Sequence, residues 1–123
     1  MNIKLCIDEL LMSGADDWVL AAEVAWVAES TGGAKTPDQI RDLSLRLIRE
    51  LLQQGMMEIG DLSEEAPHFR KWNLPMEEAL ERVEREWKAL GRLPDLGDIC
   101  WLQNTVKGNK LGKQLLKQRE SSS

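Results

Sequence analysis

Apolar residues recur every three or four positions over most of the chain, the spacing that gathers them on one face of an α-helix. The pattern predicts helices over residues 3–12, 16–29, 37–54 and 76–90, followed by a last helix over 95–106. The second of these has almost no polar face after its first turn, and a helix of that kind is buried on several sides. We therefore expect it at the centre of the core.

Local signals mark the start of the third predicted helix. Thr36 is the expected N-cap, Pro37 is the first helical residue, and Gln39 stands where it completes a capping box. Gly55 is expected to end the helix.

The periodicity changes after this helix. Residues 56–62 resemble a short strand, a polar loop follows, and residues 69–72 are a possible return strand, so a β-hairpin is expected. Three helices followed by a hairpin is the element order of a winged-helix domain. The predicted fold class is mainly α with a small β-hairpin (α+β), arranged as a winged-helix-like core plus a C-terminal helical extension.

The segment GDICWLQNTVKG over residues 97–108 contains a thiol, an indole, an acid, amides and a hydroxyl. Asp95 is the expected cap of a helix here, with Asp98 in its first turn. Helical spacing predicts that four residues face inward: Ile99, Cys100, Leu102 and Val106. We interpret the segment as a docking helix rather than a reactive site.

Charge is distributed unevenly along the chain of 123 residues, which has 16 basic and 21 acidic side chains. Residues 1–106 have 11 basic and 20 acidic side chains, whereas residues 107–123 have five basic and one acidic. The length suits one domain, so we expect a single globular domain over 1–106 and a basic, frayed C-terminal tail over 107–123. An acidic body disfavours nucleic acid and favours a basic protein partner.

The composition indicates the environment of the protein. Five tryptophans are spread along the chain, and we expect most of them in a shared core. Cys6 and Cys100 share no short spacing and have no nearby His, which favours two buried, reduced thiols over a disulfide or metal site. A secretory signal pattern and a membrane-spanning apolar run are both missing from the sequence. We expect a cytoplasmic protein with no cofactor, no metal and no membrane partner.

Catalysis is not expected. The single histidine, His68, stands beside Pro67 in an acidic loop, and the sequence has no metal-binding, phosphate-binding or nucleophile motif. Paired carboxylates are frequent, but the first turns of predicted helices account for them, because acids there complement the helix dipole. These pairs are Asp16 and Asp17, Glu77 and Glu78, and Asp95 and Asp98.

The winged-helix order makes DNA binding the alternative hypothesis, with residues 37–54 as the recognition helix and 62–67 as the wing. Recognition helices need cations for the phosphates, whereas this helix has three basic and three acidic side chains. The predicted wing is acidic, and the seven-residue connection over 30–36 is longer than a helix-turn-helix turn. A winged-helix transcriptional regulator, or an adaptor protein without catalytic activity, is therefore the second choice.

Acidic side chains concentrate on the hairpin and on the helix after it. Complementary charge speeds association with a basic protein and selects the partner. A cationic nuclease toxin is such a partner, since it must be basic to hold nucleic acid. The expected contact residues are Asp61, Glu64, Glu65, Trp72, Glu77, Glu78 and Glu81.

Three runs, LIRELLQQGMMEIGDL from Leu47, PMEEALERVEREW from Pro75 and GDICWLQNT from Gly97, resemble small bacterial immunity proteins. Such proteins protect against polymorphic and contact-dependent growth-inhibition toxins. The resemblance covers residues 40–105, and its motifs are packing and turn signals, so it transfers no catalytic residue. It implies a non-enzymatic bacterial protein that neutralises a basic toxin by direct binding.

Overall fold

The computed structural model describes residues 2–63 and 68–121, and over these residues the chain is mainly helical with one four-stranded antiparallel sheet. The predicted fold class, mainly α in an α+β arrangement, is confirmed. In chain order the elements are α1 (Ile3–Gly14), β1 (Val19–Leu20), α2 (Ala21–Ser30), α3 (Pro37–Gln53), β2 (Met57–Leu62), β3 (Phe69–Lys71), α4 (Met76–Leu90), β4 (Trp101–Asn104) and α5 (Val106–Ser121).

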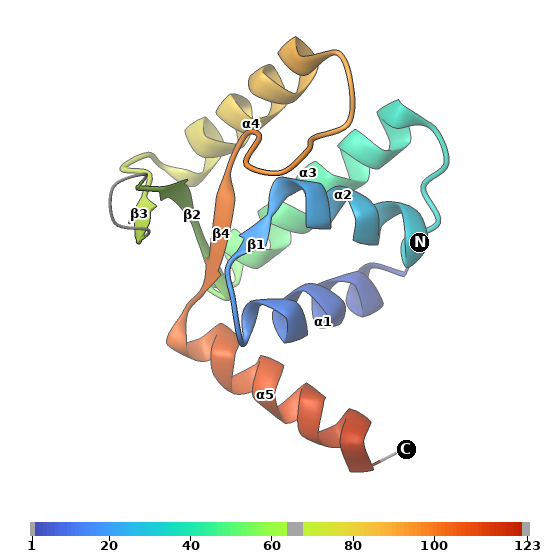
Figure 1. Ribbon diagram of the computed structural model, residues 1–123, viewed down its shortest axis with the longest axis vertical. Coiled ribbons are helices and arrows are strands. Elements are labelled where there is room, and N and C mark those ends of the chain that lie inside the picture. Colours follow the sequence, from blue (N-terminus) through green and yellow to red (C-terminus); the bar gives the residue numbers. More distant parts are fainter. Residues whose placement is uncertain (1, 64–67, 122–123) are drawn as a thin grey trace.

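The sheet has the strand order β1-β4-β2-β3, so a strand from the C-terminal part of the chain lies between β1 and β2. Strands β2 and β3 form the predicted hairpin. Leu102 of β4 stands opposite both Val19 of β1 and Ile59 of β2, and all three side chains are buried. Figure 1 shows α1, α2 and α3 on one side of the sheet, with α4 and α5 at its opposite ends. The element order up to β3 is that of the predicted winged-helix-like core. The inner strand β4, which lies between β1 and β2, comes from the chain after that core.

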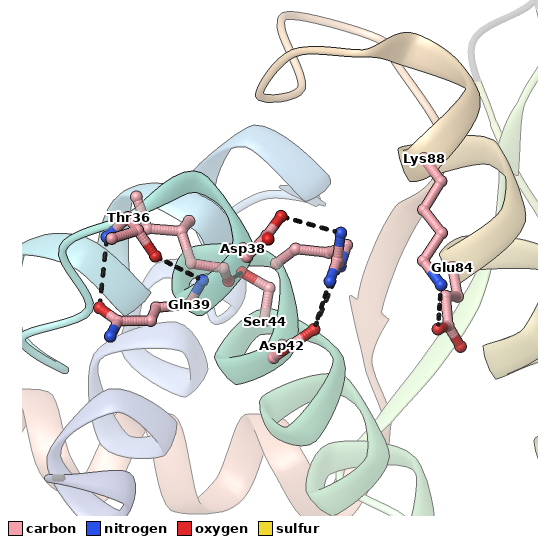
Figure 2. Close-up of polar contacts among 9 residues, drawn as sticks. Thr36, Asp38, Gln39, Asp42, Ser44, Glu84 and Lys88 are labelled. Atoms are coloured by element: carbon pink, nitrogen blue, oxygen red, sulfur yellow. Dashed lines mark hydrogen bonds and ion pairs between the residues drawn. The ribbon is translucent and has the colours of Figure 1, made fainter.

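Helices α3 and α4 begin where the local signals predict. Thr36 Oγ1 accepts a hydrogen bond from the Gln39 N–H (3.1 Å), and Gln39 Oε1 accepts one from the Thr36 N–H (3.3 Å), as Figure 2 shows. Helix α4 starts after Pro75 and ends at Gly91, whose φ of 67° lies in the left-handed region that glycine adopts without strain.

The helix predicted over residues 16–29 begins only at Ala21, so the expectation that Asp16 caps it is wrong. Residues 19–20 are extended because they pair with β4, which gives their backbone groups hydrogen-bond partners far along the chain. Helix α2 has five buried residues, as expected of a helix in the core, but its Trp26 is 66% exposed. The expectation that most tryptophans share the core is wrong, because only Trp72 and Trp87 are buried, whereas Trp18 and Trp101 are half-buried.

The last predicted helix, over residues 95–106, is also wrong, because residues 101–104 form β4. Leu102 and Asn104 are buried while Trp101 and Gln103 are half-buried, the alternation expected of a strand with one face on the core. Val106, which helical spacing placed inside, is 88% exposed.

A loop precedes β4 in place of the predicted helix start. Asp98 accepts a hydrogen bond from the Asp95 N–H (2.8 Å) and pairs with Arg92 (2.9 Å). These bonds lower the pKa of Asp98 and hold a turn. Cys100, at the end of this loop, is buried and unbridged, as is Cys6, and both thiols therefore match the prediction.

The C-terminal segment, expected to be a frayed tail, forms α5 and packs against α1. Gly108 and Gly112 are buried in the docked face of α5. A Cβ atom at Gly108 would overlap the main-chain carbonyl of Met56, and one at Gly112 would overlap that of Leu11. The two glycines therefore let α5 approach closer than any larger residue would allow.

Candidate protein-binding site

The structure divides the predicted contact residues into three groups. Glu64 and Glu65 lie outside the described residues. Glu77, Asp61 and Trp72 interact with neighbouring side chains within the fold. Glu78 and Glu81 are exposed, and within the described parts of the chain their carboxylates form no ion pair or hydrogen bond.

Glu77 joins α4 to α3. The guanidinium of Arg49 donates two hydrogen bonds to its carboxylate, one from Nη1 to Oε1 and one from Nη2 to Oε2 (3.1 Å). These bonds hold the pKa of Glu77 below its ordinary value of 4.5, against a smaller effect of desolvation. A carboxylate paired in this way offers less charge to a partner than the sequence suggested.

Arg82 of α4 covers Trp72 and meets the hairpin. Its guanidinium carbon lies 3.8 Å from the centroid of the Trp72 ring, a cation–π arrangement. It also pairs with Glu86 (2.7 Å) and lies 3.9 Å from Asp61. Trp72 is only 6% exposed, so its side chain packs beneath the predicted contact residues and offers almost no surface for direct contact with a partner.

An apolar groove of about 660 Å³ is lined in part by the first turn of α4, the helix that contains Glu78 and Glu81. It is bounded by β2, by the turn after β3, and by the first turns of α4 and α5. Leu74 and Val106 are exposed on it, Met76 is half-buried, and Trp72 contributes to its wall. We name this feature the apolar groove; its lining residues are Leu52, Gly55, Met57, Glu58, Ile59, Lys71, Trp72, Leu74, Met76, Ala79, Thr105, Val106 and Lys107.

Sequence reasoning did not find the groove, because its walls come from segments 50 residues apart in the chain. Leu74 and Met76 are ordinary apolar residues near a proline, and Val106 had been assigned to the inside of a helix. The only available signal was Trp72, which was predicted as a contact residue and does line the groove.

Two of the three basic side chains of α3 are paired with carboxylates within the fold, whereas the third, Arg46, is exposed. Arg41 pairs with Asp38 (3.2 Å) and Asp42 (3.1 Å), the two acids labelled in Figure 2. Arg49 is bound by Glu77, and α4 packs along α3. Basic side chains that are already paired with carboxylates are less available to bind DNA phosphates.

The two thiols are poor nucleophiles. Burial is the largest influence on both, raising the pKa of Cys6 and raising that of Cys100 to about 12 from an ordinary value of 9.0. A thiol with so high a pKa is protonated and unreactive near neutral pH. Among the residues that the structure describes, His, Cys, Asp and Glu form no group of three or more that could hold a metal ion.

A second hollow, which we name the polar cleft, lies at the other side of the β4–α5 junction and has a volume of about 350 Å³. Sequence reasoning missed it, since Asp16 and Asp17 were assigned to a helix start that lies at Ala21. Its lining residues are Gly14, Ala15, Asp16, Asp17, Trp18, Gln103, Asn104 and Asn109.

Over the described residues, none of the helices combines the length and apolar character needed to cross a membrane. Known protein families, curated proteins and solved structures yield no match to this chain.

Proposed function

We propose that this chain is an acidic protein-binding module: a bacterial immunity protein that neutralises a basic toxin, specifically a nuclease, by direct binding. The observation that supports this proposal best is the apolar groove beside unpaired carboxylates on the same helix. The first turn of α4 lines the groove with Met76 and Ala79, and Glu78 stands between them in the chain.

Protein interfaces commonly have an apolar centre that excludes water and a polar rim that selects the partner. Leu74, Met76 and Val106 would form such a centre, and Glu78, in the same first turn of α4 as Met76, would add a negative charge near it. A basic partner with an apolar side chain at the middle of its contact surface is complementary to both parts. Covering the catalytic cleft of a nuclease in this way would exclude its substrate.

The net charge of the chain favours this class of partner over nucleic acid. The chain has an excess of five acidic side chains, and a nuclease domain must carry the opposite charge around its active site. Complementary charge speeds the association of two proteins, and added salt weakens this electrostatic attraction. One cation of α5, Lys107, lines the apolar groove, where its ammonium group donates a hydrogen bond to the Gln54 carbonyl (2.8 Å).

The test begins with the neighbouring gene, whose product we expect to end in a basic toxin domain. The domain is expressed in a bacterial host with and without the full chain, and growth is measured; the purified pair is then assayed for nuclease activity and affinity. We expect restored growth and inhibition at a one-to-one ratio. Continued nuclease activity in the presence of excess chain would contradict the proposal, and tight, sequence-selective DNA binding by the chain would favour the winged-helix regulator.

Matched variants locate the interface. Glu78→Lys should lower affinity about tenfold at low salt, because it places a cation opposite a basic partner. Glu29→Lys, at an exposed and unpaired acid of α2, is the control with the same charge change and should have less than about a twofold effect. Val106→Glu places a charge in the apolar centre of the contact, where the partner's apolar side chain would desolvate it, and should also weaken binding. Val106 is exposed, so the substitution should leave the fold intact.

A further inference from the structure

The apolar groove contains one charge that the fold does not neutralise. Three charged residues line it: Glu58, Lys71 and Lys107. Lys71 and Glu58 pair with each other (3.1 Å), so their charges cancel. Lys107 forms no ion pair with any residue in the described ranges 2–63 and 68–121. The groove therefore has one net positive charge, although the chain as a whole has an excess of five acidic side chains.

Lys107 is held where it can meet a bound group. It lies in the first turn of α5, whose start is fixed by a hydrogen bond from the Thr105 N–H to the Met56 carbonyl (2.9 Å) and by the close packing of Gly108 on the same carbonyl. The Lys107 ammonium donates one hydrogen bond, to the Gln54 carbonyl at the end of α3 (2.8 Å). An ammonium group has three N–H donors, so two remain for a ligand, and the residue is exposed.

The rest of the groove lining offers a ligand little polar contact. The Thr105 hydroxyl already donates to the Gly55 carbonyl (2.6 Å) and accepts from the Gly108 N–H (3.1 Å). The other side chains of the lining are aliphatic or aromatic: Leu52, Met57, Ile59, Trp72, Leu74, Met76, Ala79 and Val106. A complementary occupant is therefore apolar over most of its surface and has one anionic group opposite Lys107.

We propose that the part of the partner that fills the apolar groove is an apolar side chain with a carboxylate beside it, and that this carboxylate pairs with Lys107. The inference rests on the proposed function, because it names the chemistry of the segment that enters the same site. Apolar surroundings exclude water and strengthen such a pair, whereas a cation in the same place would meet Lys107 as a like charge. The partner is then basic over most of its contact surface and acidic at this one point.

The inference reverses the sign of one charge effect on affinity for the toxin domain. If the partner were basic at every point, Lys107→Glu would remove a repulsive cation and raise the affinity. With a carboxylate opposite Lys107, the same substitution should lower the affinity about tenfold at low salt. Lys110→Glu is the matched control, at an exposed position of α5 outside the groove lining, and should not lower the affinity.

Three short peptides test the groove without the toxin domain. They are acetyl-Leu-Glu-Leu-amide and the two peptides that have Gln or Lys in place of Glu. The full chain, labelled with ¹⁵N, is titrated with each, and the Lys107 amide and Trp72 indole signals are followed by NMR. We expect saturable shifts with a Kd on the order of 1 mM for the Glu peptide. The Gln peptide should bind about fivefold more weakly and the Lys peptide at least about tenfold more weakly.

This order of affinities cannot come from the net charge of the chain, which favours the Lys peptide. Matched variants assign the preference to Lys107. The Lys107→Gln variant should bind the Glu and Gln peptides equally, because the ammonium that distinguishes them is gone. The Lys110→Gln variant should keep the fivefold preference of the native chain.

Three results would overturn the proposal. The first is equal binding of the three peptides by the native chain, and the second is a preference for Glu that survives Lys107→Gln. The third is the appearance of the same shifts when the chain alone is concentrated, which would assign the groove to a second copy of the chain.

The chemistry of the groove and the proposed function fail separately. If the native chain prefers the Glu peptide through Lys107 but the toxin domain does not bind, the groove stands as a site for an apolar, acidic segment and the immunity function is wrong. If the toxin domain binds the Lys107→Glu variant as tightly as the native chain or more tightly, the function stands and the carboxylate contact is wrong.

Discussion

Replacing Gly108 by Ala tests whether the C-terminal segment is a docked helix. The added Cβ would overlap the Met56 carbonyl oxygen, which belongs to the backbone and cannot move aside as a side chain can. On a frayed or isolated helix the same substitution stabilises by about 1 kcal/mol, because glycine loses more backbone entropy than alanine. The two effects have opposite signs, so the direction of the change alone distinguishes the two structures.

The size of the effect follows from the closeness of the contact. To relieve the overlap, α5 must move about 1 Å away from Met56 in the turn before β2, which opens gaps around the half-buried leucines of α5. Overpacking of this kind costs about 3 kcal/mol. Subtracting the gain of about 1 kcal/mol in helix propensity leaves a net loss of about 2 kcal/mol. For a chain of this size the melting temperature should fall by about 8 °C.

Urea unfolding and thermal melting measure this change. Gly112→Ala, which meets the Leu11 carbonyl, should behave in the same way. Gln114→Ala, at an exposed position of the same helix, is the control and should change stability by less than about 0.5 kcal/mol. Faster hydrogen exchange confined to α5 would show that the helix has undocked. A Gly108→Ala variant as stable as the native chain, or more stable, would refute the reasoning.

Three further predictions concern the core and its titrating groups. Leu102→Ala should lower the free energy of unfolding by about 3 kcal/mol and Val106→Ala by less than about 0.5 kcal/mol, since the first is buried and the second exposed. Comparable losses from the two variants in urea unfolding would instead support a helix over 95–106, which places both residues inside. Burial raises the pKa of Cys100 to about 12, so the contribution of this thiol to stability is complete below pH 9.0 and is lost as the pH rises toward 12. The free energy of unfolding measured between these pH values should therefore fall with pH, and Cys100→Ala should reduce that slope. Arg49→Gln should return the pKa of Glu77 toward its ordinary value of 4.5 in an NMR titration. The stability from this pair is present above pH 4.5 and is lost as the pH falls through the lowered pKa. A Glu77 pKa that the substitution leaves unchanged would show that the pair does not form in solution.

The candidate site was only partly predictable. Glu78 and Glu81 are exposed, and that much follows from acidic residues at the outer positions of an amphipathic helix; Asp61 is exposed on strand β2. The pairing of Glu77 with Arg49 was not predictable, because the two residues are 28 positions apart and their helices meet only in the fold. The same holds for the apolar groove and the polar cleft, each of which is lined by several separate segments.

The sequence by itself determined the elements whose signals are local. Thr36, Pro37 and Gln39 start α3 because their side chains satisfy backbone groups within one turn, and Gly91 ends α4 because its own φ is positive. Helix periodicity over 15 to 17 residues is also a local property, so both helices were correctly placed.

Only the tertiary structure decided the two short strands and the last helix. Residues 19–20 and 101–104 are too short to show a period of their own. Residues 19–20 are extended because β4, some 80 residues away, pairs with them, and residues 101–104 are extended because they pair with both β1 and β2. Helix α5 is polar on most of its surface, and its docking depends on two glycines that have no side chain to form a hydrophobic pattern. A hydrogen bond across the sheet and a close approach of two backbones depend on partners distant in sequence, and one-dimensional periodicity does not contain that information.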